Sequence, residues 1–343
     1  MRVYQGDPTK LAADSPVLST DLLAYVAQTY GFDIADAEKL GGSWNLNVRA
    51  DLVTGERCVI RVYGPWVTAA RVHELQRIRR ILDEKGLPTP QLQPTTDGTF
   101  STLFEGSVVE VETYVDGTPM QTWQQLCTGM RTLAKLHTHM AALDCEIPPP
   151  VANHLPEELA LAATEDVLRV IEAWDPTPQE QRFAAAVAEL VQMLPVVELP
   201  VQLVHGDFKD NNLVFRENKL AAVLDFDFMG VRPRIDDLAL PLHTLLQRGM
   251  PLRDVQRLVD LYDAGCAVPL SQQERRALPH AMARMALCYL QYMLIPGDEA
   301  YQLHCRREFN ENRGPACVWW LEQLRNRRFR EDGFMNRTTT LCH

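Results

Sequence analysis

The order of apolar and polar positions divides the chain into a strand-rich first part and a helical second part. Helical spacing of apolar residues after Thr20 and Asp21 predicts a leading helix over 20–31, with one of these two residues as its N-cap. A second helix is predicted from about residue 68 to residue 85. Short alternating or apolar runs predict strands at 37–40, 44–52, 58–63, 91–93, 100–103 and 108–114.

Residues 116–119, a turn-forming Asp-Gly-Thr-Pro segment, interrupt this pattern, and nearly every element predicted after them is a helix. The exception is a compact strand-turn-strand region over 201–228. Helices are predicted at 123–143, 157–174 and 178–194, and three or four more follow up to about residue 329. We therefore expect an α+β chain of two lobes, a β-rich N-terminal lobe at 1–116 and a mostly helical C-terminal lobe at 117–343.

Composition narrows the class of protein. The chain has 343 residues, of which 46% are hydrophobic, so it can bury a large core. Its 45 acidic and 34 basic residues give a net charge of −11, which opposes nucleic-acid binding. This charge suits a small cationic partner better, although many soluble cytoplasmic proteins are equally acidic.

Neither a membrane span nor an export signal is expected. No run of the chain approaches the roughly 18 uncharged apolar residues that span a bilayer, and residues 285–295 are expected to form a buried helix. Residues 1–20 lack the apolar core of a secretory signal. The eight cysteines form no C-x-x-C pair, which is typical of reduced thiols. We expect a cytoplasmic protein, for which monomer and homodimer both stay open.

The residues that carry chemistry lie in the strand-turn-strand region. A loop at 205–212 places Asn212 five residues after Asp207, and the hairpin that follows delivers Asp225 eighteen residues after Asp207. Phosphoryl transfer to a hydroxyl requires a carboxylate that accepts the hydroxyl proton. It also requires an amide oxygen and a second carboxylate that hold Mg²⁺ on the phosphates. Asp207, Asn212 and Asp225 match these roles in that order.

The loop, His-Gly-Asp-x₄-Asn, and the later Asp-Phe-Asp resemble the aminoglycoside phosphotransferase and choline kinase superfamily. The resemblance implies a bilobal protein-kinase-like fold, with ATP and Mg²⁺ bound between the lobes. It implies that Asp207 is the catalytic base and that Asp227 supports the metal beside Asn212 and Asp225. Lys209 stands where protein kinases carry a lysine that contacts the transferring phosphate, so it is a second catalytic candidate.

Two neighbours of this set have a structural interpretation. We expect His205 to brace the loop through hydrogen bonds rather than to act as a base. We expect Asp237 to brace the loop or to cap the next helix. A lone aspartate in a turn is structural by default, but for Asp207 the joint spacing of three residues of the right types outweighs that interpretation.

The first lobe contains candidate contacts for the nucleotide. The backbone amides of Gly42 and Ser43, between two predicted strands, could approach phosphate oxygens, although an ordinary hairpin turn explains the same residues. The run 58–64 resembles the third strand of this fold, whose basic residue contacts the phosphates and pairs with a glutamate on the next helix. Here the basic residue is Arg61, as is frequent in choline kinase-like enzymes. Glu74 is its expected partner, and a solvated surface glutamate is the alternative.

Residues 112–117 resemble the hinge between the lobes of such enzymes. The resemblance implies that backbone groups near Thr113 and Val115 pair with adenine. A buried strand end is the competing interpretation.

Absent motifs exclude other enzyme classes. The chain has no G-x-x-x-x-G-K-[ST], G-x-G-x-x-G, G-x-S-x-G or H-E-x-x-H sequence. It also lacks the Asp-Phe-Gly and Ala-Pro-Glu segments of protein kinases. Residues 229–234 lead almost directly into a predicted helix, which disfavours a peptide substrate.

The expected activity is ATP-dependent O-phosphorylation of a small molecule. Its acceptor stays open among an aminoglycoside or other antibiotic, choline or ethanolamine, homoserine and a sugar-like metabolite. We expect the acceptor pocket to come from residues 150–200 and the last helices, where acidic side chains either bind an amine or form a solvated surface. The rival interpretation is a catalytically inactive regulator that binds a nucleotide or metabolite; the intact Asp207, Asn212 and Asp225 argue against it.

Overall fold

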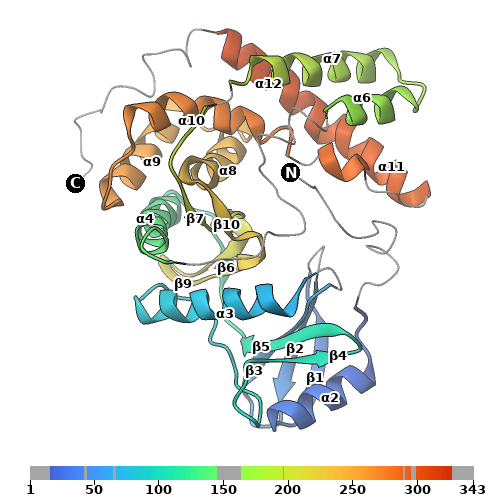
Figure 1. The fold of residues 1–343 in the computed structure, drawn as a ribbon, viewed down its shortest axis with the longest axis vertical. Coiled ribbons are helices and arrows are strands. Elements are labelled where there is room, and N and C mark those ends of the chain that lie inside the picture. The colour runs from blue at the N-terminus through green and yellow to red at the C-terminus, as the bar shows by residue number, and fades with distance from the viewer. Residues whose placement is uncertain are drawn as a thin grey trace.

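The fold is mixed α+β, with a sheet at one end of the molecule and helices at the other (Figure 1). The computed structural model describes residues 16–41, 45–64, 67–144, 164–195, 197–288, 290–294 and 299–326. The predicted fold class, with a β-rich N-terminal lobe and a helical C-terminal lobe, is confirmed.

A five-stranded antiparallel sheet, in the order β1-β2-β3-β5-β4, forms the N-terminal lobe. Its strands are β1 (Ile34–Lys39), β2 (Leu46–Leu52), β3 (Arg57–Val62), β4 (Ser101–Phe104) and β5 (Ser107–Thr113). Alternate residues of β2, such as Val48 and Ala50, are buried against helix α2 (Thr20–Tyr30). The N-cap of α2 is Ser19, whose Oγ accepts from the Leu22 amide at 3.1 Å, so the predicted capping by Thr20 or Asp21 is wrong.

One predicted strand does not form. Residues 91–93 hydrogen-bond to the end of β5, but they form an isolated bridge, between Leu92 and Glu112, and not a strand. Prolines flank this run at residues 90 and 94, and proline cannot donate to a strand ladder. After β5 the chain enters the short strand β6 (Thr118–Pro119), which pairs with the second lobe. The lobe boundary at residue 116 stays a prediction.

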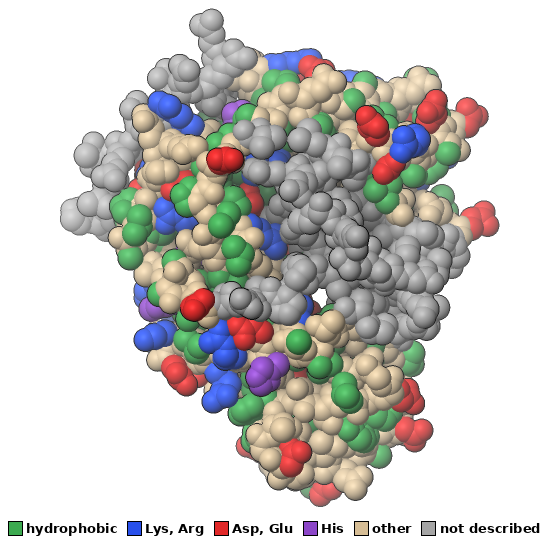
Figure 2. Space-filling view, in the orientation of Figure 1, with side chains coloured by type: hydrophobic (Ala, Val, Ile, Leu, Met, Phe, Trp, Pro, Cys, Tyr) green, Lys and Arg blue, Asp and Glu red, His purple; other side chains and the backbone are tan. Residues whose placement is uncertain are grey.

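Helix α3 (Ala69–Glu84) lies between the sheet and the helical lobe (Figure 1). Leu75, Ile78 and Leu82 belong to the large core of the second lobe. Gln76 and Arg79 are buried on the side that meets the sheet, where Gln76 donates to Glu110 at 2.8 Å. The space-filling view shows basic side chains gathered over this part of the molecule (Figure 2). Because α3 contributes residues to the core of the second lobe and hydrogen-bonds to the sheet, both lobes pack on this one helix.

The C-terminal lobe is helical around two small sheets, β7–β10 and β6–β8–β9. Its strands are β7 (Val201–Val204), β8 (Leu213–Arg216), β9 (Lys219–Val223) and β10 (Gly230–Pro233). Its helices are α4 (Trp123–Met140), α6 (Thr164–Glu172), α7 (Pro178–Met193), α8 (Arg234–Gln247), α9 (Leu252–Gly265), α10 (Gln272–Arg284), α11 (Glu299–Glu308) and α12 (Gly314–Arg325). Part of the predicted helix 157–174 lies outside the described residues.

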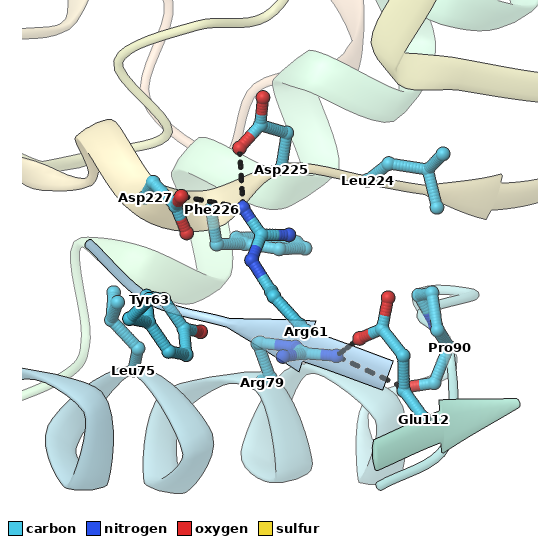
Figure 3. Close-up of a pocket in the computed structure, with 10 residues that line it drawn as sticks. All are labelled: Arg61, Tyr63, Leu75, Arg79, Pro90, Glu112, Leu224, Asp225, Phe226 and Asp227. Carbon is cyan, nitrogen blue, oxygen red and sulfur yellow. Dashed lines mark hydrogen bonds and ion pairs between the residues drawn. The ribbon is translucent and has the colours of Figure 1, made fainter. Parts of the chain in front are cut away.

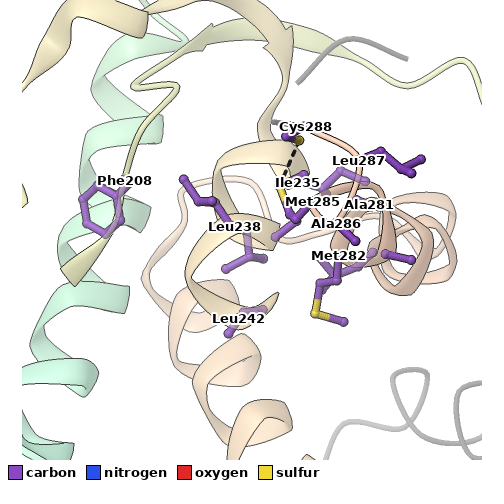
Figure 4. Close-up of a cluster of buried hydrophobic side chains, with 14 of the residues drawn as sticks. Phe208, Ile235, Leu238, Leu242, Ala281, Met282, Met285, Ala286, Leu287 and Cys288 are labelled. Carbon is purple, nitrogen blue, oxygen red and sulfur yellow. Dashed lines mark hydrogen bonds between the residues drawn. The ribbon is translucent and has the colours of Figure 1, made fainter. Parts of the chain in front are cut away.

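The segment expected as a buried helix at 285–295 is buried but not α-helical where the structure describes it. Helix α10 ends at Arg284, and the chain continues through turns into the 3₁₀ helix η3 (Leu290–Leu294). Met285, Ala286 and Leu287 pack with Ile235 and its neighbours on α8 (Figure 4). No helix within the described ranges is long and apolar enough to cross a membrane.

His243 on α8 joins the last helix to this core. Its ring stacks on Trp320 with centroids 5.7 Å apart, and the Trp320 indole N–H donates to His243 Nδ1 at 2.8 Å. Burial lowers the pKa of His243 from 6.5 to about 4. The folded protein therefore keeps this imidazole neutral.

We predict that His243 makes stability depend on pH. Because its pKa is lower in the folded than in the unfolded state, its contribution is complete above pH 6.5 and is lost as the pH falls toward 4. The loss should reach about 3 kcal/mol. Urea unfolding from pH 7 to pH 4 should show a shallower fall for His243→Asn than for the wild type. Parallel curves for the two proteins would contradict this prediction.

Candidate active site

The loop between β7 and β8 is held by one buried carboxylate. Both oxygens of Asp237 accept backbone amides, from His205 and from Gly206, at 2.6 Å each, and His137 Nε2 lies 3.1 Å from Asp237 Oδ2. His205 Nε2 donates to the Leu224 carbonyl at 3.0 Å, while its Nδ1 accepts the Asp207 amide at 3.2 Å. Burial lowers the pKa of His205, which keeps this neutral form. The predicted bracing roles of His205 and Asp237 are confirmed.

Asp207 is buried at the centre of the loop with one oxygen held and one unpaired. Its Oδ2 accepts from Asn212 Nδ2 at 2.9 Å and lies 2.8 Å from Lys209 Nζ. Its Oδ1 has no hydrogen-bond partner among the described residues. Burial raises the pKa of Asp207 to about 7, against the opposing charge of Lys209. Among the described residues, the loop therefore presents one carboxylate oxygen without a donor.

Asp225 and Asp227 follow β9 in a tight turn, the 3₁₀ helix η2 (Phe226–Phe228). Asp225 adopts a left-handed conformation, with φ at 63°, which turns the chain at the end of the strand. Arg61 Nη2 lies 3.1 Å from Asp225 Oδ1 and also pairs with Asp227 Oδ2 (Figure 3). Burial raises the pKa of Asp227 to about 6, although Arg61 opposes this. Two carboxylates thus converge on one cationic nitrogen.

Asn212 completes this group from the side of Asp207. Its Nδ2 donates to the backbone carbonyl of Asp207 at 2.8 Å as well as to Asp207 Oδ2. Because the amide nitrogen is used in this way, the amide oxygen is the group that can face a metal. The structure thus forms two groups, one of Asp207, Lys209 and Asn212 and one of Arg61, Asp225 and Asp227. They are joined where the amide of Leu224, the residue before Asp225, donates to the Asn212 carbonyl at 2.8 Å.

The predicted Arg61–Glu74 pair is wrong. Glu74 binds Arg77 on its own helix, at 2.8 Å and 2.6 Å, while Arg61 binds the two aspartates. On α3 the side facing the sheet carries Gln76 and Arg79, so Glu74 points elsewhere. Glu74 is paired within its own helix and only 16% of its side chain is exposed, so it is not the solvated surface residue of the alternative either.

A second ion-pair group, which the sequence analysis missed, lies below Arg61 in the same pocket (Figure 3). Arg79 Nη1 lies 2.7 Å from Glu110 Oε1, and Arg79 Nη2 pairs with Glu112. Tyr63 also donates to Glu110, at 2.9 Å. Two glutamates within the apolar strand Val-Val-Glu-Val-Glu-Thr were the available signal, because charged residues in a buried strand require partners. The open space among these groups is only about 10 Å³.

Two further side chains of the first lobe reach residues 225–229, which we call the aspartate turn. Asn45 Nδ2 donates to Asp227 Oδ2, while its Oδ1 accepts the Gly64 amide at 3.0 Å. Arg71 Nη2 donates to the Asp227 carbonyl at 2.5 Å and to the Met229 carbonyl at 2.7 Å. Asn45 lies two residues after Ser43; the candidate phosphate contacts Gly42 and Ser43 lie outside the described residues.

The hinge candidates lie at the end of β5. The Thr113 amide donates to the Gln91 carbonyl at 2.8 Å, and Thr113 Oγ1 accepts the Gln91 amide at 2.9 Å. The next amide, of Tyr114, donates to the Arg57 carbonyl at 3.1 Å. The Thr113 amide is therefore occupied within the protein. Contacts of adenine with other backbone groups near Thr113 and Val115 stay a prediction.

Comparison with protein families matches this chain to one of them. The model of the phosphotransferase enzyme family, APH, matches residues 37–269. No curated protein matches the sequence.

Solved structures share the fold at low sequence identity. A spectinomycin phosphotransferase in complex with ADP and spectinomycin has a TM-score of 0.65 at 15% identity, covering 90% of this chain and 100% of that one. A microcompartment-associated aminopropanol kinase has a TM-score of 0.64 at 15% identity, with 89% and 97% covered. Amicoumacin kinase hAmiN in complex with AMP-PNP, Ca²⁺ and Ami has a TM-score of 0.62 at 14% identity, with 86% and 94% covered.

We predict that Gly206 tolerates no side chain. A Cβ there would lie 2.1 Å from the Phe228 carbonyl oxygen, and φ is +84°. Gly249, at φ +86° with nothing within 4 Å, is the matched control. Both alanine variants pay about 1–2 kcal/mol for the left-handed backbone, but Gly206→Ala should lose about 2 kcal/mol more because of the clash. Equal losses in denaturant unfolding would contradict the prediction.

Proposed function

Since this chain belongs to the phosphotransferase enzyme family and is an ATP-dependent small-molecule phosphotransferase, we propose that Asp207 activates a hydroxyl group of the acceptor. The observation that supports this proposal is the buried Asp207 Oδ1, which has no donor among the described residues. An acceptor hydroxyl supplies the missing donor. As its oxygen attacks the γ-phosphorus, the proton passes to Asp207, the bond to the β–γ bridging oxygen breaks and ADP leaves.

Lys209 and Arg61 are the proposed contacts of the transferring phosphoryl group and the other phosphates. Lys209 Nζ lies 2.8 Å from Asp207 Oδ2, so it is next to the carboxylate whose other oxygen, Oδ1, is the proposed contact of the acceptor. Arg61 extends from β3 into the pocket between the lobes and is already paired with carboxylates there. A guanidinium can bind phosphate oxygens in the same geometry as carboxylate oxygens, so nucleotide can take over these contacts.

The proposed Mg²⁺ ligands are Asn212, Asp225 and Asp227. They fit the ion, because the two carboxylates converge on a single cationic nitrogen of Arg61 and all three supply the oxygen donors that Mg²⁺ prefers. Within the described part of the chain, no three His, Cys, Asp or Glu side chains form a metal cluster, which agrees with a site completed by an amide and by phosphates. When bound, Mg²⁺ neutralises phosphate charge.

The acceptor class is proposed from the fold relatives. Two of the solved structures are named for spectinomycin and for aminopropanol, so an antibiotic or an amino alcohol, including choline or homoserine, is the proposed acceptor. The acidic residues of α6 do not add to this, because Glu165, Asp166 and Glu172 are exposed and Asp166 pairs with Arg169. Glu157 and Glu158 lie outside the described residues.

We predict that Asp207→Ala lowers turnover by about 10²–10⁴-fold while nucleotide binding persists. The measurement is Mg²⁺-dependent ATP consumption with a panel of aminoglycosides, other antibiotics, amino alcohols and homoserine, with nucleotide binding followed by calorimetry. Asp21→Ala, an exposed aspartate on α2, is the matched control and should retain full activity.

Each outcome decides between the interpretations. Stimulation by one acceptor, lost in Asp207→Ala, supports the proposal and identifies the substrate. Full activity of Asp207→Ala would overturn the role of Asp207. Failure of the wild type to bind Mg·ATP would overturn the kinase proposal, whereas binding without turnover for any acceptor would overturn the proposed acceptor class and place the substrate outside the panel.

A further inference from the structure

The backbone of the aspartate turn is held by donors from both lobes. The Phe226 carbonyl accepts the Met229 amide at 3.0 Å, and the Phe228 carbonyl accepts Arg232 Nη2 at 2.8 Å. The carbonyls of Asp227 and Met229 accept from Arg71 Nη2, at 2.5 Å and 2.7 Å. Every carbonyl from residue 226 to residue 229 thus has a donor, and a single arginine of the first lobe supplies two of them.

Arg71 is buried, and its backbone is fixed at the start of α3. It lies in the first turn of α3, where Thr68 Oγ1 accepts its amide at 3.3 Å as the N-cap. Only 3% of the residue is exposed. Its side chain extends from the helix that both lobes share to the turn that carries the proposed metal ligands. At this turn its hydrogen bonds go to backbone carbonyls.

The turn is confined on its other side by the catalytic loop. Gly206 packs so closely on the Phe228 carbonyl that a Cβ would approach within 2.1 Å. The turn is therefore fixed between the loop that carries Asp207 and the N-terminus of α3. A shift of the turn toward α3 would move Asp225 and Asp227 relative to Asn212, which belongs to the loop.

We propose that Arg71, a residue of the first lobe, is a positioning residue: it fixes the positions of the Asp225 and Asp227 carboxylates that bind the metal. The proposal rests on the proposed function, since it concerns the same Mg²⁺ site. Arg71 acts through the carbonyls of the turn and does not touch the metal. Outer-shell groups of this kind change metal affinity by about 10- to 100-fold when they are removed.

The test measures metal binding directly, with Mn²⁺ as the probe and ADP present. Free Mn²⁺ is followed by its electron paramagnetic resonance signal. The proteins are the wild type, Arg71→Met, Arg71→Lys and Arg275→Met. Arg275 of α10 is the matched control. It is also a buried arginine, 8% exposed, but it pairs with Asp263 of α9, within the helical lobe. Thermal unfolding of each protein is recorded in parallel.

We expect Arg71→Met to weaken Mn²⁺ binding by about 10-fold or more, and Arg71→Lys, which keeps a donor for both carbonyls, to recover most of it. Arg275→Met should lower the unfolding temperature by a similar amount and leave Mn²⁺ binding unchanged. Should Arg71→Met fail to fold, Arg71→Gln, whose amide is too short to reach both carbonyls, takes its place with the same expectation.

Two results would overturn the proposal. One is wild-type Mn²⁺ affinity in the Met or Gln variant. The other is a loss of affinity in Arg275→Met as large as that in the Arg71 variant, which would reduce the effect to general destabilisation. Absence of Mn²⁺ binding by the wild-type protein in the presence of ADP would instead count against the proposed function itself.

Discussion

The carboxylates of Asp225 and Asp227 lie close together, and their side chains are only 33% and 17% exposed. Each needs a partner there, because an uncompensated charge at a partly buried position is destabilising. Among the described residues, the hydrogen bonds and ion pairs of these two side chains come from the first lobe. Arg61 pairs with both aspartates, and Asn45 donates to Asp227, so the compensating groups come from the sheet of the first lobe. The junction of the two lobes is therefore also the site where a metal and a nucleotide are expected.

The same requirement explains the arrangement beneath Arg61. Glu110 is fully buried in β5, and Arg79 of α3 supplies its counter-charge, with further donors from Tyr63 and Gln76. The helix thus carries the cation and the strand carries the acids, which is the reverse of the expected pair between Arg61 and a helix glutamate. Because Arg79 anchors α3 to the sheet, Arg61 is left to bind groups of the other lobe.

Asp237 has the corresponding role in the second lobe. It holds two consecutive amides of the loop and contacts His137, whose Nδ1 lies 2.7 Å from the Tyr262 hydroxyl. With the backbone fixed in this way, the side chain of Asp207 keeps one oxygen unpaired among the described residues. A group that is buried and unsatisfied costs stability, and such costs are typical of functional sites.

The sequence by itself determined the fold class, most strands and helices, and the set Asp207, Asn212 and Asp225, because periodicity and short spacings along one loop and hairpin are local properties. Local bracing by His205 was predictable for the same reason. Only the tertiary structure decided that Arg79 faces the sheet instead of Glu74, and that Asn45 and Arg71 reach the aspartate turn. These contacts join residues far apart in the chain, so they depend on which helix face is buried and how the lobes meet.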